Sequence, residues 1–435
     1  MKPQQTISQP AEITGRGLFT GEESFVRFKP APVNAGITFV RSDQPAPVRI
    51  AAVVENVTKR ARRTTLRNGT VAIETVEHCL SACSGLGVDN LEIEISADEL
   101  PSGDGSSQIF VDALRNAGFE TQSTEKRGYR IEQPVRVTEG DAELVAWPGE
   151  DDSLTVRYEL DYGGGPIGRQ AYSIRLTPED YLAEIAPSRT FVLQAEAEQL
   201  QAAGLGCHLT YRDILVFNGD GPIENELRYP EECVRHKILD LIGDLMLFGR
   251  PIWGNVFARR SGHALNHSLV RHLRKAAEVR EANQLAATRP TYDVRQIQRI
   301  IPHRYPLLMI DRVVSLEGTE RAVAIKNVTI NEAYFQGHYP GQPIMPGVLV
   351  IEAMAQLGGI LLSQELEHKG KIAVLLSLDK VKFRRPVVPG DQLILEALAV
   401  RVKARTGHVR CNARVGDTLV AEADVKFMMV DADPI

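Results

Sequence analysis

The sequence predicts an α+β chain in which two related units precede a third unit of different build. Residues 1–126 and 127–275 each begin with short stretches of alternating apolar and polar residues and end in helical segments. Such alternation is typical of half-buried strands. From residue 291 to residue 435, one long apolar helical segment is followed by several long strands. This last order predicts a sheet wrapped around a single helix, and residues 276–290 are expected to form a linker.

The composition is that of an ordinary soluble globular protein, with 43% hydrophobic and 24% charged residues among 435. A net charge of −6 argues against a broad nucleic-acid surface. The N-terminus lacks the apolar segment of a secretory signal. The most apolar stretch, residues 348–362, is short and interrupted by Glu352 and Gln356, so no membrane span is expected. The five cysteines form no CxxC pair and are expected to be buried thiols. We therefore expect a cytoplasmic protein.

In the first unit, alternation predicts strands and helical spacing predicts helices. Strands are expected over residues 24–28 and 91–95, and helices over residues 74–84 and 107–116. Gly85 and Gly87 would close the first of these helices.

The second unit is expected to repeat this order. Strands are predicted over residues 127–131 and 172–176, and helices over residues 192–203 and 230–248. The glycine-rich residues 163–168 lack the Gly-Lys-Ser/Thr of a phosphate-binding loop, and Pro166 interrupts them, so a surface loop is expected there.

The third unit starts after Pro290, with Asp293 as the expected N-cap of a short helix. The long apolar helix is predicted over residues 346–363. Long antiparallel strands are predicted over residues 372–385, 392–404, 407–415 and 418–430.

A metal site is suggested by His236 and Asp240, which are four residues apart in a segment with helical apolar spacing. Side chains at this spacing leave the same face of a helix and suit two ligands of one metal ion. His78, preceded by Glu77, is the candidate third ligand, and three protein ligands leave tetrahedral zinc one open position. A lone His-x-x-x-Asp is more often structural, so the interpretation depends on the joint pattern.

The neighbouring titratable residues suit hydrolysis at such a metal. Glu77 is a candidate general base, because a carboxylate next to a ligand lies close to the metal's water. His263 could protonate a leaving amine, and Asp244, one turn beyond Asp240, could orient His263.

Over about residues 5–275 the chain resembles the zinc-dependent UDP-3-O-acyl-N-acetylglucosamine deacetylases of lipid A synthesis. The matching runs are TVEHCLSACSGLGVDN (75–90), DGS (104–106), SRTF (188–191), VRHKILDLIGDL (234–245) and SGHALN (261–266). The chain departs from the family at Phe19, where a histidine is usual, and at the Ser102-Gly103 pair.

The resemblance implies two β/α sandwich subdomains with one zinc ion between them. It assigns His78, His236 and Asp240 to the metal, Glu77 as base and His263 as acid, with Asp244 supporting His263. It further implies that Thr190 helps to hold the oxyanion, that Phe191 lies against the sugar and that Lys237 contacts the UDP-sugar lipid precursor.

A second candidate site contains His338, in the turn GHYPG, and Glu352, on the long apolar helix. A loop histidine and a partnered core carboxylate are the commoner interpretations of each residue alone. Together they suit β-elimination, in which one group takes a proton α to a carbonyl and the other protonates the departing hydroxyl. Free N–H groups at Gly347, where the helix begins, could hold a thioester oxygen.

Over about residues 291–430 the chain resembles the 3-hydroxyacyl-acyl-carrier-protein dehydratases. The matching runs are IPHRYPLLMIDRV (301–313), VTINEAYFQGHYPGQPIMPGVLVIEAMAQLGG (328–359) and KFRRPVVPGD (382–391). The resemblance implies a hotdog fold, no cofactor, and dimers whose sites combine His338 of one subunit with Glu352 of the other, usually assembled into hexamers.

Lys380, Lys382 and Arg384 alternate with apolar residues, which places three cations on one face of a strand. A solvated face is the plain interpretation. The functional one is a docking site for the acidic acyl carrier protein or the phosphate of its prosthetic group.

Both resemblances concern 3-hydroxyacyl groups, so the sequence predicts a bifunctional enzyme. The alternative is that one half is catalytically silent and serves as an oligomerisation or regulatory module. A thioesterase of the same fold is disfavoured, because PGVLVIEAMAQ follows the dehydratase pattern.

Overall fold

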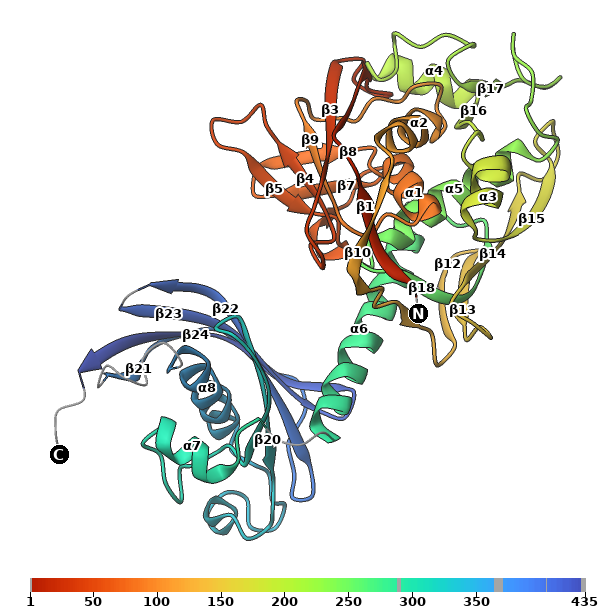
Figure 1. The fold of residues 1–435 in the computed structure, drawn as a ribbon. Helices are drawn as coiled ribbons and strands as arrows, with labels where there is room; N and C mark the ends of the chain where they lie inside the picture. Colours follow the sequence, from red (N-terminus) through yellow and green to blue (C-terminus); the bar gives the residue numbers. More distant parts are fainter. Residues whose placement is uncertain (1, 288–290, 364–370, 404, 432–435) are drawn as a thin grey trace. The chain divides into compact units, whose positions relative to one another are not determined.

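The computed structural model describes residues 2–287, 291–363, 371–403 and 405–431. They form two compact units, Met1–Arg274 and Lys275–Ile435, each with its own sheets and helices (Figure 1).

The first half of unit 1 is built on a five-stranded sheet of order β2-β3-β9-β4-β5. Its strands are β2 (Ala11–Arg16), β3 (Glu23–Pro30), β4 (Ile37–Arg41), β5 (Val48–Ala51) and β9 (Leu91–Ile95). Val26 and Phe28 of β3 are fully buried and alternate with partly exposed neighbours, as the sequence pattern predicts. Around this sheet lie η1 (Val54–Asn56), α1 (Glu77–Leu86), α2 (Gln108–Ala117), the pair β1 (Pro3–Ile7) and β10 (Phe119–Glu125), and the small sheet of β6 (Val57–Thr58), β7 (Thr65–Asn68) and β8 (Val71–Glu74).

The second half repeats this plan with the order β12-β13-β18-β14-β15. In both halves the last strand inserts between two hairpins. β9 is antiparallel to β3 and parallel to β4, and β18 is antiparallel to β13 and parallel to β14. The strands are β11 (Tyr129–Arg130), β12 (Val135–Glu139), β13 (Ala142–Trp147), β14 (Leu154–Asp161), β15 (Arg169–Arg175) and β18 (Ile252–Arg259), and the helical segments are α3 (Pro178–Asp180), η2 (Tyr181–Ile185), α5 (Glu232–Met246) and α6 (His263–Ala287).

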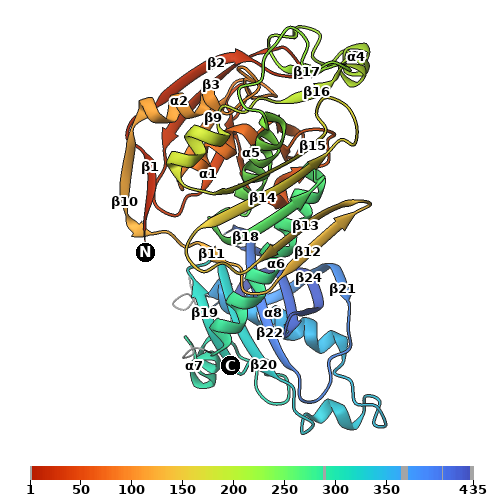
Figure 2. The same cartoon turned by 90° about the vertical axis from the view of Figure 1, so that its right-hand side faces the viewer.

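The two halves meet where α1 packs against α5, between the two sheets (Figure 2). The contact is close because Gly243 of α5 has no side chain. A Cβ atom at Gly243 would lie 2.0 Å from the carbonyl oxygen of Glu77. Almost every residue of both helices is buried, so the helices form the interior of the unit.

Some sequence-based boundaries of unit 1 differ from the structure. The first helix begins at Glu77, contains Gly85 and ends at Leu86, with Gly87 as its C-cap at a left-handed φ of 72°. The ring of Tyr181 packs against Gly85, and it can approach so closely because Gly85 has no side chain: a Cβ would be 2.2 Å from the ring.

Other differences lie in the second half. Phe191–Leu193 form β16, a strand paired with β17 (Leu215–Phe217), and the helix α4 (Gln194–Ala202) begins only after it. Residues 163–168 form the loop between β14 and β15, as expected. The expected linker is helical as far as the structure describes it, because α6 continues to Ala287.

Unit 2 is a six-stranded antiparallel sheet around the helix α8 (Gly347–Ser363), with order β19-β20-β22-β23-β24-β21. The strands are β19 (Arg312–Glu317), β20 (Arg321–Asn327), β21 (Lys371–Phe383), β22 (Gln392–Lys403), β23 (Thr406–Val415) and β24 (Thr418–Asp431), and η3 (Ala333–Gln336) precedes α8. Asp293 caps α7 (Val294–Ile300) as predicted, its carboxylate accepting from the backbone N–H of Gln296. The apolar side of α8 fills the core of this unit, together with the inner residues of β20 and β22–β24.

The strands of unit 2 do not follow one another as a simple meander. β21 pairs with β24 at the edge of the sheet, and β22 pairs with β20 instead. Side-chain alternation identifies a strand but not its partner, so the sequence could not show this order.

Two further findings bear on the sequence-based expectations. Among the helices that the structure describes, none is both long and apolar enough to cross a membrane. All five cysteines are free, and four are buried, but Cys207 is exposed, in contrast to the expectation for all five.

The close crossing of α1 and α5 gives a prediction for Gly243→Ala. The new Cβ would collide with the backbone of Glu77, which cannot move away as a flexible side chain does. We expect a loss of at least about 3 kcal/mol in the free energy of unfolding, the upper range for overpacking. Gly219→Ala is the control, since no atom lies within 4 Å of its Cβ position. Equal denaturant midpoints for both variants would contradict the importance of this contact.

Candidate active sites

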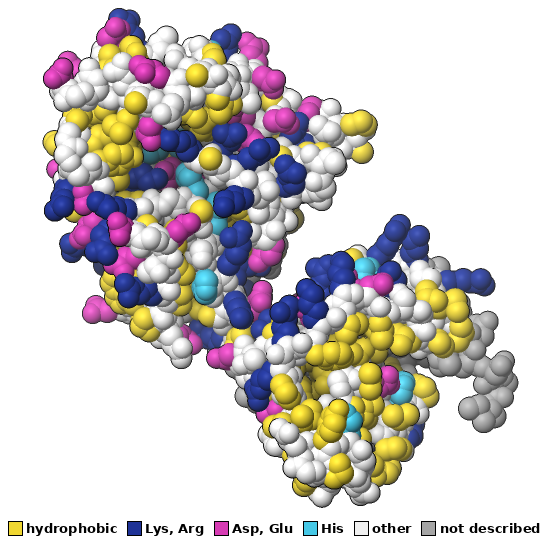
Figure 3. Space-filling view, turned by 180° about the vertical axis from the view of Figure 1, so that it is seen from behind, with side chains coloured by type: hydrophobic (Ala, Val, Ile, Leu, Met, Phe, Trp, Pro, Cys, Tyr) yellow, Lys and Arg dark blue, Asp and Glu magenta, His cyan; other side chains and the backbone are white. Residues whose placement is uncertain are grey.

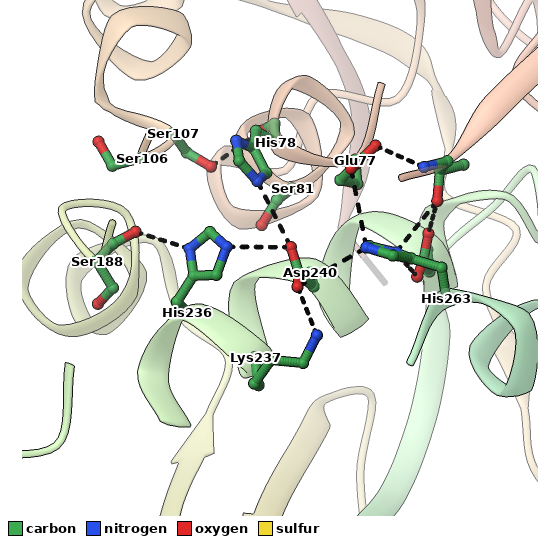
Figure 4. A network of polar contacts seen from close by, with 12 residues as sticks. Glu77, His78, Ser81, Ser106, Ser107, Ser188, His236, Lys237, Asp240 and His263 are labelled. Carbon is green, nitrogen blue, oxygen red and sulfur yellow. Dashed lines mark hydrogen bonds and ion pairs between the residues drawn. The ribbon is translucent and has the colours of Figure 1, made fainter. Parts of the chain in front are cut away.

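Three predicted metal ligands converge in the interior of unit 1. His78 of α1 and His236 and Asp240 of α5 each offer one ligand atom, and these atoms lie within 4.8 Å of one another. Both imidazole Nε2 atoms face Asp240 Oδ1, at 3.5 Å from His78 and 3.4 Å from His236 (Figure 4). All three residues are buried. Two imidazoles and one carboxylate around a common point suit a zinc ion with one position left open.

The surroundings of these three residues favour the binding of a cation. The backbone carbonyl of Ser188 accepts from His236 Nδ1 at 3.1 Å, which leaves Nε2 as the nitrogen with a lone pair. Burial lowers the pKa of His236 to about 4, so its ring is neutral, as a ligand must be. Burial opposes ionisation of Asp240, but Lys237 and His236 hold its pKa well below the usual range. Lys237 Nζ lies 2.8 Å from Asp240 Oδ2.

Glu77 lies beside this group at the first position of α1. The backbone N–H of Thr64 donates to Glu77 Oε2 at 3.1 Å, and His263 Nε2 lies 3.9 Å from Glu77 Oε1. Burial raises the pKa of Glu77, and the nearby histidines oppose this rise only in part. A buried carboxylate with a raised pKa beside a metal site is suited to accept a proton from water.

The backbone is strained directly before Glu77. Thr75 has a left-handed φ of 59°, which is an outlier for a β-branched residue. Its hydroxyl donates to Glu99 Oε1 at 2.8 Å, and the same buried carboxylate accepts from the backbone N–H groups of Phe19 and Thr20. Glu99 therefore fixes both the entry to α1 and the loop around Phe19.

Asp244 holds His263 as the sequence predicted. Its Oδ2 accepts from His263 Nδ1 at 2.8 Å and from the side-chain amide of Asn266 at 2.8 Å. Its Oδ1 accepts from the hydroxyl of Thr64 and faces His267 Nε2 at 3.1 Å. Burial disfavours charge on His263, but Asp244 and Asp240 raise its pKa to about 9, so the ring is protonated at neutral pH.

A cavity of about 1320 Å³ opens onto these residues. Its lining includes Thr190, Phe191 and Lys237, the three residues to which the deacetylase resemblance assigns substrate contacts. Thr190 is fixed through its backbone N–H, which donates to the carbonyl of Gly105 at 2.8 Å. The ring of Phe191 stands edge-on to that of His236 at 6.2 Å. The predicted residues of unit 1 thus share one site.

In unit 2, the geometry around His338 indicates its tautomer. His338 Nδ1 lies 2.7 Å from the backbone carbonyl oxygen of Ile344. A carbonyl oxygen only accepts, so Nδ1 carries the hydrogen, and Nε2 of the neutral ring has a free lone pair. Tyr339, the next residue, has a left-handed φ of 52°. The turn therefore fixes the ring of His338 through Nδ1.

Glu352 projects from α8 between two donors. His303 Nε2 lies 3.3 Å from Glu352 Oε1, and the side-chain amide of Gln356 donates to the same oxygen at 2.8 Å. Gln356 also donates to the carbonyl of Leu307 and accepts from the N–H of Met309, so it fixes the segment that carries His303. The hydrogen bond from His303 lowers the pKa of Glu352, although burial opposes this.

The described contacts of His338 and Glu352 do not join these two residues within one chain. Gly347 is the first residue of α8, as expected, and lies beneath the ring of Phe383, where a Cβ would be 2.8 Å from a ring carbon.

The three predicted cations face two carboxylates of β24. Lys380 lies 3.1 Å from Asp424, while Lys382 and Arg384 lie 3.6 and 2.7 Å from Glu422. The strand is not regular here, because the register shifts between Asp379 and Lys382, and Lys380 has a φ of 53°. The three cations nevertheless share one side of the sheet.

Sequence reasoning missed several residues at these sites. His267 lies four residues after His263 on the same helix, a spacing that could have identified it. His303 and Gln356 lie inside the runs that carry the second resemblance. Ser188 lies inside the matching run SRTF but acts through its backbone carbonyl, which its residue type does not reveal. Thr64 comes from a loop distant in sequence, and none of the matching runs contains it.

Comparison with known proteins gives matches for both units. The profile of the UDP-3-O-acyl N-acetylglycosamine deacetylase family (LpxC) matches residues 4–275, and that of the FabA-like domain matches residues 301–424. A relative named bifunctional enzyme LpxC/FabZ from Chlorobaculum tepidum is 37% identical over 98% of both chains. Relatives of the same name from Bacteroides thetaiotaomicron and Porphyromonas gingivalis are 35% and 34% identical over 99% of both chains.

The contact between His303 and Glu352 gives a prediction for His303→Asn. The hydrogen bond from His303, which is the main cause of the lowered pKa, is then removed while burial remains. The pKa of Glu352 should therefore rise. Carbon NMR of labelled glutamate side chains, with Glu352→Gln to assign the signal, measures this titration. His408→Asn, which alters a contact with Asp424 instead, should leave the Glu352 titration in place. An unchanged Glu352 titration in His303→Asn would refute the contact.

Proposed function

The chain belongs to the family of bifunctional LpxC/FabZ enzymes, and we propose that the residues described above divide its two reactions between the two units. Unit 1 is the deacetylase, which acts on UDP-3-O-(3-hydroxyacyl)-N-acetylglucosamine in lipid A biosynthesis. Unit 2 is the dehydratase, which converts 3-hydroxyacyl-acyl-carrier-protein to the trans-2-enoyl form. The observation that carries the first assignment is the buried His78–His236–Asp240 group at the base of the large cavity.

We propose zinc as the metal of unit 1, held by His78, His236 and Asp240. The donor set, its burial and the carbonyl that orients His236 support this choice. When bound there, zinc lowers the pKa of a water molecule and polarises the carbonyl of the acetamide. The positive charge of Lys237 lies next to Asp240 and offsets the negative charge of this carboxylate. Both side chains leave α5 towards the cavity, which they line.

Glu77 and His263 would then move the protons. Glu77 takes a proton from the attacking water, since its raised pKa makes it a suitable base. His263, protonated and held by Asp244, gives a proton to the departing amine. Thr190 lies at the cavity wall to hold the developing oxyanion, and Phe191 lies beside it to contact the sugar.

In unit 2, His338 would take the proton α to the thioester carbonyl through its free Nε2. Glu352 in its protonated form would donate to the hydroxyl that leaves as water. Gln356 donates to Glu352 Oε1 and fixes the direction of this carboxyl group. The N–H groups at the start of α8, near Gly347, would hold the thioester oxygen. This chemistry needs no cofactor.

We further propose that the dehydratase site is completed by a second subunit. β21 lies at the edge of the sheet, and its exposed residues include Val374, Leu375 and Leu376. Tyr339 and Val348, which lie close in sequence to the site residues, are 62% and 72% exposed. Hydrophobic side chains gather broadly on the face of unit 2 drawn in Figure 3. An unpaired apolar edge of this kind needs a partner strand, and a second copy supplies one.

The cations Lys380, Lys382 and Arg384 are proposed to receive the acidic acyl carrier protein. Lys380 and Lys382 are largely exposed and Arg384 is about half exposed. An incoming acidic surface would compete for them with Asp424 and Glu422.

Removal of zinc tests the division into two independent sites. Dialysis against a chelator should abolish release of acetate and leave hydration of enoyl thioesters intact, since the metal group of the described residues lies in unit 1 alone. Glu77→Gln is the control: it should retain zinc and lose deacetylation by about 10²- to 10⁴-fold. Equal loss of both activities on chelation would refute the two-site assignment.

Subunit mixing tests the shared dehydratase site. His338→Ala and Glu352→Gln chains should each be inactive, and exchange of their subunits should restore part of the activity, because some mixed sites combine an intact His338 with an intact Glu352. Mass spectrometry of differently labelled chains verifies exchange. Exchange without any recovery would place both residues of a site in one subunit.

A further inference from the structure

The helix α4 forms one wall of the deacetylase cavity but has little packing of its own. Ala197 and Leu200 of α4 and Leu205 and Leu209 of the following loop line the cavity with apolar side chains, beside the polar Gln194, Glu198 and Gln201 of α4. No residue of α4 is buried. A helix attached so weakly is free to move against the rest of the unit unless another contact holds it.

Such a contact comes from the loop of residues 59–63, of which residues 59–62 also line the cavity. A terminal nitrogen of Arg62 donates to Glu196 Oε1 at 2.8 Å. Glu196 belongs to α4, and its other oxygen accepts from the backbone N–H of Leu193. Among the described residues, the Arg62–Glu196 ion pair is the side-chain interaction that joins α4 to a distant part of the sequence.

The backbone of Arg62 is itself strained. Its φ of 63° lies in the left-handed region, which is unfavourable for a residue other than glycine, asparagine or aspartate. Such strain persists where the surroundings impose it and is common at functional sites. Arg62 also lines the cavity, so the strained turn directs a cation to the cavity's edge.

We propose that the Arg62–Glu196 pair is a latch that holds the α4 wall against the acyl chain of the substrate and thereby determines affinity for that chain. The inference rests on the proposed deacetylase function. Ala197 and Leu200 are the α4 side chains that an acyl chain would contact, and the latch holds this helix, of which no residue is buried.

The strength of the pair fits such a role. The two side chains are 47% and 34% exposed, and ion pairs of this kind shift an equilibrium by up to about fivefold. The pair is therefore too weak to decide whether the unit folds. The pair is strong enough to change the fraction of time for which α4 is held in place. It is weak enough to break when substrate enters or product leaves.

The test compares Arg62→Asn, Glu196→Gln and the charge-exchanged double variant Arg62→Glu/Glu196→Arg on the full-length zinc-loaded enzyme. Asparagine tolerates the left-handed backbone, so the first variant removes the guanidinium without adding strain. Each single variant should raise KM for a long-chain UDP-3-O-(3-hydroxyacyl)-N-acetylglucosamine by about two- to fivefold, with a smaller change in kcat. The inhibition constant of UDP-N-acetylglucosamine, which has no acyl chain, should stay the same.

The double variant should restore the low KM, and about 1 M salt should remove the difference between the wild type and the single variants. Arg27→Asn is the matched control, because Arg27 and Glu12 form an ion pair of similar exposure away from the cavity. It should leave KM unchanged.

Two results would overturn the latch. If the charge-exchanged variant has a KM no better than the single variants, the two residues do not act as a pair. If the inhibition constant of UDP-N-acetylglucosamine rises together with KM, Arg62 contacts the nucleotide end instead. A wild-type enzyme that releases no acetate from the long-chain substrate would instead refute the deacetylase function, and the latch with it.

Discussion

The close contact of α1 with α5 at Gly243 is the constraint on which the deacetylase site depends. The metal group takes His78 from one helix and His236 and Asp240 from the other, so its geometry is the geometry of this helix pair. The absence of a side chain at Gly243 lets the backbones approach until the carbonyl of Glu77 lies against α5. Because the two halves of unit 1 repeat one sheet plan, the site lies between two equivalent helices, one from each half.

Burial of this helix pair decides the electrostatics of the site. Charges far from water must be paired, and here Asp240 faces Lys237 while Asp244 faces His263. The same burial keeps the ring of His236 neutral, as a metal ligand must be, and raises the pKa of Glu77, which strengthens this carboxylate as a proton acceptor. The carboxylate of Asp244, shared among His263, His267, Asn266 and Thr64, therefore both stabilises the fold and fixes the ring of His263.

Unit 2 is organised on a different principle. Its core is complete around α8, but the proposed catalytic residues His338 and Glu352 face separate partners in one chain, and the edge strand β21 exposes apolar side chains. In our proposal, unit 1 is catalytically complete in one chain, whereas unit 2 requires a second copy. Both reactions use 3-hydroxyacyl groups, and their fusion would link the supply of fatty acids to the synthesis of lipid A.

The sequence by itself determined the features that depend on neighbours along the chain. The i,i+4 spacing put His236 and Asp240 on one face of α5, Asp293 was identifiable as the cap of α7, and the apolar run of α8 was found within one residue of its bounds. Family motifs supplied His78, His263, His338 and Glu352. Only the tertiary structure decided the strand orders, the pairing of β21 with β24, the helical state of Gly85 beneath Tyr181, and the convergence of Thr64, His267 and Asp244. Those features arise from packing between segments far apart in the chain, and a local pattern of residues specifies the face that a segment buries but not the segment that covers it.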